Sequence, residues 1–217
     1  MKDKVAVMML GYNTEKPNFR KVAWGSPPDK PGRLVTSVAV ALREEAERLI
    51  IAMGAKGKDG RPGSVITEDL LFENIWQLSE FNIMRRILKE ISVSQIEKSL
   101  QKIVEPFVSR VGTRFKFRDS AKSLYEEGFS RIIIVTSPDH MSRAVRDSFT
   151  EWLNPPFSLE FVPSSTLYSC EDGETPPERA SMENVVVIEP PSPVGALAKK
   201  MLSAGPEVLT KIREILE

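Results

Sequence analysis

The chain has 217 residues, of which 41% are hydrophobic and 28% charged, an ordinary globular profile that is long enough for one substantial domain. Thirty basic residues balance thirty acidic ones, so the sequence does not indicate long-range attraction to nucleic acid or to an anionic membrane. Cys170 is the only cysteine and His140 the only histidine, which excludes an internal disulfide and argues against a metal site of the zinc type.

A short apolar run opens the chain and is followed by a loop, a helix and a second apolar run. Residues 5–10 are continuously apolar and end at Gly11, which is typical of a strand buried on both faces of a parallel sheet. Residues 12–31 are rich in Pro, Gly and Asn and predict a long loop. The apolar stripe over 34–49 predicts an amphipathic helix, and the run 49–53 predicts the next strand.

Helical patterns dominate the next part of the chain. Residues 67–88 predict a helix that we expect to break near residues 81–82. Ser94 and Glu97 have the spacing of a capping box and predict the start of a second helix. Because proline disrupts a helix interior, Pro106 is expected to end that helix.

The clearest predicted strand covers residues 131–136 and contains three consecutive isoleucines, which suit a central buried strand. A helix at 116–127 precedes it and ends at Gly128, in the position of a C-terminal cap. Ser137 is expected to cap the next helix, whose first residue is Pro138. The inner face of this helix is predicted to consist of Met141, Ala144, Val145, Ser148, Phe149 and Trp152.

The remaining predicted elements are short. They are strands at 107–111, 159–162 and 184–188, a polar loop at 163–182, a stiff connector at 189–193, and terminal helices at 194–203 and 207–215.

Strands and helices therefore alternate along most of the chain. This alternation predicts an α/β fold with a mostly parallel sheet covered by helices on both faces. We expect a single domain over residues 1–217, with residues 68–106 as a helical insertion within it. No stretch reaches the roughly 20 apolar residues that a membrane span needs, and no signal peptide is evident. The expectation is a cytoplasmic protein without a membrane span.

The predicted sheet indicates where a ligand would bind. In open α/β sheets, ligands bind beyond the carboxyl ends of the strands, close to helix N-termini. The candidate ligand-binding residues at such positions are Gly11, Asn13, Gly54, Thr113 and Ser137.

The segment after the strand at 131–136 is the most specific of these places. Asp139 lies in the first helical turn, where the helix dipole favours a carboxylate. His140 and Arg143 are three residues apart and share one helical face, so they can act on one ligand. His140 is a candidate acid or base, and Arg143 a candidate anion ligand. The alternative interpretation is purely structural. In it, Asp139 only caps the helix, His140 is a packing side chain, and Arg143 is a charge exposed to solvent.

Two further residues are candidates on their positions in predicted helices. Arg33 stands at a helix start, where a cation opposes the dipole, so either its side chain reaches away or it meets an anion. Glu68 lies in the first turn of its helix and is a candidate proton-handling group, although ordinary helix-start chemistry also explains it. The chain has neither a GxGxxG fingerprint nor a P-loop, which excludes an ordinary nucleoside triphosphatase.

The stretch Ile132-Ile133-Ile134-Val135-Thr136-Ser137-Pro138-Asp139-His140-Met141-Ser142-Arg143-Ala144 resembles the signature of the SanA/YdcF/ElyC family. Further similar segments follow the family order: Val7 to Gly11, Arg33 with Ile50 to Gly54, Thr67 to Asp69, and Asp119 to Ala121, where Ser120 replaces the asparagine of the family. The resemblance implies a Rossmann-like sheet, arranged in three layers, with a polar pocket. It also implies that Gly11, Arg33, Glu68, His140 and Arg143 converge on that pocket.

These residues predict a small-molecule-binding protein, an enzyme acting on an anionic, nucleotide-like or phosphate-bearing ligand by hydrolysis or group transfer. Arg33 and Arg143 would hold the anion, with His140 and Glu68 as proton-handling groups. Two alternatives stay open: a module that binds S-adenosylmethionine or a nucleotide without turnover, and an interaction protein with an inactive pocket. The oligomeric state is left open.

Overall fold

The apolar runs of the sequence become the strands of one parallel sheet. The computed structural model describes residues 3–110, 112–152 and 157–166. In this part of the chain, all strands of the central sheet run parallel in the order β5-β4-β1-β6-β7. Their bounds are Val5–Leu10 (β1), Arg48–Met53 (β4), Val104–Val108 (β5), Arg131–Thr136 (β6) and Ser158–Pro163 (β7).

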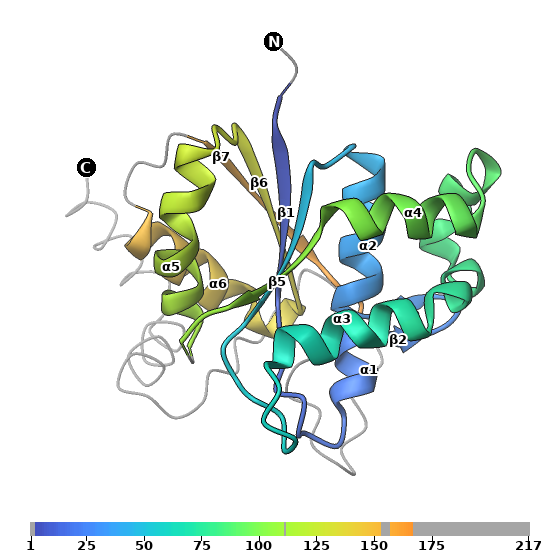
Figure 1. Cartoon of the computed structure of the whole chain (residues 1–217), viewed down its shortest axis with the longest axis horizontal. Coiled ribbons are helices and arrows are strands. Elements are labelled where there is room, and N and C mark those ends of the chain that lie inside the picture. The colour runs from blue at the N-terminus through green and yellow to red at the C-terminus, as the bar shows by residue number, and fades with distance from the viewer. Residues whose placement is uncertain (1–2, 111, 153–156, 167–217) are drawn as a thin grey trace, which may run out of the picture. The chain divides into compact units, whose positions relative to one another are not determined.

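Helices cover both faces of this sheet (Figure 1). The α-helices are Phe19–Ala23 (α1), Arg33–Arg43 (α2), Gly63–Glu73 (α3), Val93–Ile103 (α4), Thr113–Glu126 (α5) and Pro138–Glu151 (α6). The segment predicted as a long loop, residues 12–31, contains α1 and the strands Gly25–Ser26 (β2) and Lys30–Pro31 (β3), which form a small antiparallel pair, so that prediction is wrong in part. The fold is thus a three-layer, Rossmann-like α/β arrangement, as predicted.

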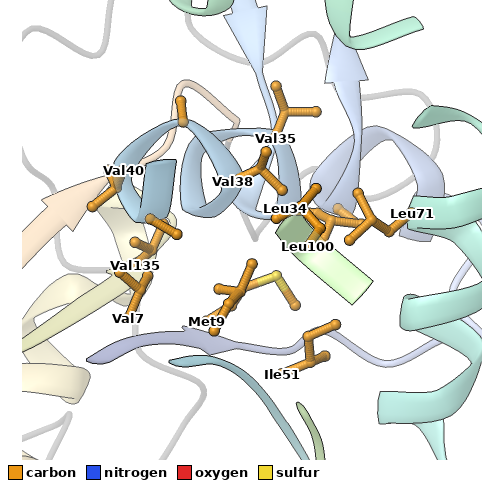
Figure 2. Close-up of a cluster of buried hydrophobic side chains, with 14 of the residues drawn as sticks. Val7, Met9, Leu34, Val35, Val38, Val40, Ile51, Leu71, Leu100 and Val135 are labelled. Atoms are coloured by element: carbon orange, nitrogen blue, oxygen red, sulfur yellow. The ribbon is translucent and has the colours of Figure 1, made fainter. Parts of the chain in front are cut away.

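Alternation of side chains along each strand explains why both faces need helices. Odd-numbered residues of β1, such as Val7 and Met9, lie in one hydrophobic cluster with the side chains of α1 to α4. Figure 2 shows Leu34 and Val38 of α2 in this cluster, together with Met9. Even-numbered residues of the same strand face a second cluster with side chains of α5 and α6, because successive side chains of a strand point to opposite faces.

The strand order creates a crevice beside β1. From β1 the chain moves outward through β4 to β5, and it then returns to the other side of β1 to form β6 and β7. Helix α2 follows β1 and packs on one face, whereas α6 follows β6 and packs on the other. The carboxyl ends of β1 and β6 therefore mark a topological switch point, where open α/β sheets bind their ligands.

The helix predicted over 67–88 is shorter than expected and begins earlier, at Gly63, so Glu68 does not lie in its first turn as predicted. Helix α3 ends at Glu73, and the chain continues as 3₁₀ turns at Ile75–Glu80 (η1), Asn82–Met84 (η2) and Ile87–Lys89 (η3). The side-chain amide of Asn74 donates to the carbonyl of Leu70 (2.8 Å), a local bond of the kind that competes with helix continuation. The buried residues then recur every third position, which matches the three residues per turn of a 3₁₀ helix: Ile75, Leu78, Phe81 and Met84.

The segment predicted as a helical insertion, residues 68–106, runs from within α3 to the first residues of β5. Its buried side chains, such as Leu71 and Leu100, lie in the same hydrophobic cluster as those of α1 and α2. The segment is therefore part of the helical layer on that face of the sheet. All described elements belong to one compact unit, Met1–Val185.

Pro106 has a different role from the predicted one. Helix α4 ends at Ile103, and Pro106 lies inside β5, opposite Ile51 of β4. The predicted strand at 107–111 thus begins three residues earlier, at Val104. In the described sheet β5 is an edge strand, and a proline is tolerated there because its missing N–H does not interrupt a ladder on both sides.

The capping box of α4 lies two residues before the predicted one. The Ser92 hydroxyl accepts from the Gln95 backbone N–H (3.3 Å), and the Gln95 side chain accepts from the Ser92 backbone N–H (2.8 Å). Ser94, predicted to be the cap together with Glu97, is already inside the helix.

The two serines form a matched pair for a stability measurement. We expect Ser92→Ala to lower the free energy of unfolding by about 1 kcal/mol, because it leaves a helix N–H without its acceptor. Ser94→Ala, an exposed change within the helix, should stay within about 0.5 kcal/mol of wild type in urea unfolding. Equal losses in the two variants would contradict the observed cap.

The predicted loop at 163–182 is described only to residue 166. The predicted strand at 184–188, connector at 189–193 and helices at 194–203 and 207–215 lie outside the described residues. In the described part of the chain, no helix is both long and apolar enough to cross a membrane.

Candidate functional site

A pocket of about 480 Å³ lies at the switch point of the sheet. Its lining includes Gly11 and Asn13 from the end of β1, Thr113 and Lys116 from α5, and His140 and Arg143 from α6. The structure therefore brings together five of the residues predicted from the sequence, namely Gly11, Asn13, Thr113, His140 and Arg143.

Two helices present matching pairs of side chains to this pocket. Thr113 and Lys116 are three residues apart at the start of α5, and His140 and Arg143 have the same spacing at the start of α6. Residues three apart share a helical face, so each helix contributes two polar groups to one pocket. Gly112 precedes α5 with φ 118°, a backbone conformation that side-chain-bearing residues rarely adopt.

The His140 ring is fixed by hydroxyl groups on both sides. Its Nδ1 lies 2.9 Å from Thr136 Oγ1, and its Nε2 lies 3.2 Å from Thr113 Oγ1. Burial of the ring, followed by the positive charges of Arg33 and Lys116, lowers the pKa of His140 well below its usual value. At neutral pH the ring is uncharged and can accept a proton from a hydroxyl group.

Lys116 is a buried cation-forming group at the same pocket. Burial lowers its pKa to about 7, and the charges of Arg33 and Arg143 act in the same direction. Its Nζ lies 3.5 Å from the carbonyl oxygen of Gly11, at the outer limit of a hydrogen bond. Among the described residues, no carboxylate forms an ion pair with Lys116. An anion bound in the pocket would supply a negative charge with which the protonated amine can pair.

Arg33 does not line the pocket, but its guanidinium donates to the carbonyl of Gly11, which does (3.3 Å). The same guanidinium donates to the carbonyl of Leu10 (2.7 Å) and to the hydroxyl of Ser137 (2.8 Å), and the residue is only 1% exposed. The side chain thus reaches from the start of α2 to the carboxyl end of β1, which resolves the unfavourable position of a cation at a helix start. Arg33 joins β1 to β6 and raises the positive potential around Lys116 and His140.

Ser137 occupies the expected position before α6, but its side chain does not cap the helix. Its hydroxyl accepts from Arg33 instead, so the predicted capping bond is wrong although Pro138 begins the helix as expected. Gly54 has a packing role at the end of β4. A Cβ on this residue would lie 2.3 Å from the carbonyl oxygen of Arg110, so the two loops meet too closely for a side chain.

Glu68 lies apart from this group. It is in α3, and partial burial, followed by the charge of Asp69, raises the pKa of its carboxyl. The pocket lining among the described residues does not include Glu68, so its convergence with His140 and Arg143 is not observed. A proton-handling role for Glu68 stays a prediction.

Sequence reasoning missed Lys116. The sequence pattern predicts a helix at 116–127, with Lys116 as its first residue, whereas α5 begins at Thr113. The signal that could have found it is the spacing of Thr113 and Lys116, which repeats that of His140 and Arg143 after another strand. Burial and the neighbouring charges, which set its chemistry, come only from the fold.

Comparison with known proteins adds no further information. No family model, curated protein or solved structure matches the chain. The resemblance to the SanA/YdcF/ElyC family therefore stays a prediction. In the described part of the chain, His, Cys, Asp and Glu side chains do not gather in groups of three or more that could hold a metal ion.

Proposed function

We propose that the protein binds a small, phosphate-bearing, nucleotide-like anion in the pocket between β1, α5 and α6, and that it acts on this ligand by hydrolysis or group transfer. The observation that carries the proposal is the convergence of Lys116 and Arg143 from two helix starts, close to the buried charge of Arg33. A membership in the SanA/YdcF/ElyC family is part of the same proposal, supported by the positions of Gly11, His140 and Arg143.

The charge balance of the pocket favours an anion. Asp147 also lines the pocket, but its carboxylate accepts a hydrogen bond from Arg146 (2.9 Å), so its negative charge is paired with the positive charge of the arginine. Lys116 and Arg143 have flexible, positively charged side chains suited to phosphate oxygens. The start of α5, from Gly112 to Phe115, lines the pocket, so its backbone N–H groups and the positive end of its helix dipole favour a phosphate group there.

The same pocket holds groups for proton transfer. His140 is uncharged at neutral pH and lies within reach of the Thr113 hydroxyl (3.2 Å), so it can accept a proton from this hydroxyl or from a water that replaces it. Lys116, when protonated, can donate to a leaving oxygen. These two residues are the groups that we propose for acid–base chemistry on the bound ligand.

Thermal denaturation with a ligand panel tests the site. The panel contains inorganic phosphate, phosphate esters, nucleotides, sugar nucleotides and S-adenosylmethionine. A ligand at 100 times its dissociation constant should stabilise wild type by roughly 2.7 kcal/mol. We expect Arg143→Ala to lose most of this gain, because it removes a charge from the pocket, whereas Arg86→Ala, at an exposed arginine, should retain it.

The outcomes separate the candidate functions. Equal stabilisation of wild type and Arg143→Ala, or no stabilisation by any phosphate-bearing ligand, would contradict the proposed site. Release of product from a stabilising ligand over hours would support an enzyme. Stabilisation by S-adenosylmethionine without turnover would instead support the binding-module alternative.

A further inference from the structure

We infer that Lys116 is a nucleophilic amine that forms an imine with the carbonyl group of a phosphate-bearing aldehyde or ketone bound in this pocket. The inference rests on the proposed anion site, because that site holds the phosphate while the amine attacks. It narrows the ligand class from phosphate-bearing molecules in general to those that also carry a reactive carbonyl group.

The amine of Lys116 is largely buried and lies at the pocket. Lys116 is 7% exposed, and it lines the pocket together with Thr113 and Arg143. Its single hydrogen-bond acceptor among the described residues is the carbonyl of Gly11, at 3.5 Å. An amine held this loosely keeps its lone pair available to a ligand once it is deprotonated.

Positive charges act on the amine from two other helices. Arg33 of α2 and Arg143 of α6 are close enough to lower its pKa, and His140 on α6 is uncharged. The remaining charged groups that line the pocket are bound elsewhere: Asp147 to Arg146, and Arg114 of its own helix to Glu151 (2.7 Å). Burial next to other cations is the known means by which proteins keep a lysine neutral and nucleophilic.

The proposed reaction needs no oxidant or reductant. The lone pair of Lys116 Nζ attacks the carbonyl carbon, and the π electrons of the C=O bond move to its oxygen. One amine proton passes to that oxygen, which gives a carbinolamine. The second proton leaves nitrogen as the C–O bond breaks, water departs, and the C=N bond forms. The Thr113 hydroxyl, hydrogen-bonded to His140 Nε2, is placed to relay these protons.

The imine can be trapped with a probe of the right class. Pyridoxal 5′-phosphate carries both an aldehyde and a phosphate, and borohydride reduces its imine to a stable secondary amine. We expect peptide mapping by mass spectrometry to find the label on Lys116 of the full-length protein. At pH 7, labelling there should exceed that of the exposed Lys98 by at least about tenfold, since an ordinary lysine is almost fully protonated at this pH.

Matched controls distinguish imine formation at Lys116 from binding at the proposed anion site. Lys116→Arg cannot form an imine, so it should lose the label, while the binding of inorganic phosphate is measured on the wild-type protein. Pyridoxine 5′-phosphate, which lacks the aldehyde, should protect Lys116 from labelling. If Lys116→Arg folds poorly, the wild-type peptide map still decides.

The two ways of failing are distinguishable. Labelling of Lys116 no stronger than that of Lys98, with inorganic phosphate still bound, would overturn the imine and leave the anion site standing. Absence of both the label and phosphate binding would overturn both.

Discussion

Lys116→Met is expected to make the protein more stable at pH 7, by on the order of 4 kcal/mol in the free energy of unfolding. The reason is that folding moves the amine from water, where its pKa is 10.5, to a buried position where its pKa is about 7. Folding therefore either removes a proton from the amine or confines its charge, and each costs free energy. Methionine fills similar space without this cost.

The gain should depend on pH in a defined window. Between about pH 7 and pH 10.5 the unfolded chain binds more protons at this position than the folded protein does. The stability of wild type should therefore rise with pH in this window, by up to about 1.4 kcal/mol per pH unit, relative to the variant. The penalty is fully present below pH 7 and nearly absent at pH 10.5. Urea unfolding of both proteins between pH 7 and pH 9.5 measures the difference.

Two further variants control for effects of the substitution itself. Lys98→Met, at an exposed lysine, should show no such pH-dependent difference from wild type. Lys116→Arg retains a buried charge and should not gain stability. A stability difference between wild type and Lys116→Met that stays constant from pH 7 to pH 9.5 would contradict a lowered pKa.

A stabilising substitution at this position would also bear on function. Residues that cost stability are concentrated where activity needs them, because selection retains them only for what they do. Lys116→Met should therefore combine higher stability with loss of phosphate binding. A variant that gains stability and binds inorganic phosphate as well as wild type would argue against a role for this amine in the proposed site.

Trp152→Ala is expected to lower the free energy of unfolding by about 3 to 5 kcal/mol, since it leaves a large cavity. Trp152 follows α6 and is 4% exposed, with its ring 4.8 Å from that of Phe117 and 5.2 Å from that of Phe157. Its indole N–H donates to the carbonyl of Phe117 (2.8 Å), so the substitution also removes a buried hydrogen bond. Urea unfolding at pH 7.5 measures the loss.

Phe149 provides the control on the same helix. The sequence pattern placed it on the inner face with Trp152, but it is 54% exposed, so that part of the prediction is wrong. Phe149→Ala should therefore change the free energy of unfolding by no more than about 0.5 kcal/mol. Similar losses for the two variants would contradict the observed packing of α6.

The two residues also show how far a periodic pattern can be trusted. Phe149 and Trp152 are three positions apart and both apolar, so periodicity alone assigns them to one face. Burial depends on what lies opposite, and the rings of Phe117 and Phe157 pack against that of Trp152, whereas Phe149 is exposed. In the same way, Ser94 and Glu97 have the spacing of a capping box, but the actual start of α4 makes Ser92 the cap.

The sequence by itself determined the central strands β1, β4 and β6 and the location of the main candidate site. The runs at 5–10, 49–53 and 131–136 are apolar at every position or nearly so, and such runs are stable only when both faces are covered, which requires a parallel sheet with helices on each side. The rule that ligands bind beyond strand ends then selects Gly11, Thr113 and Arg143 from the sequence alone.

Only the tertiary structure decided which of these groups share a pocket and what their chemistry is. The strand order places β6 beside β1, which brings α5 and α6 together and excludes Glu68 from the lining. The low pKa values of Lys116 and His140 follow from burial and from charges that approach from other elements, chiefly Arg33. Such effects depend on distances between residues far apart in the chain, and a linear pattern of residues does not contain those distances.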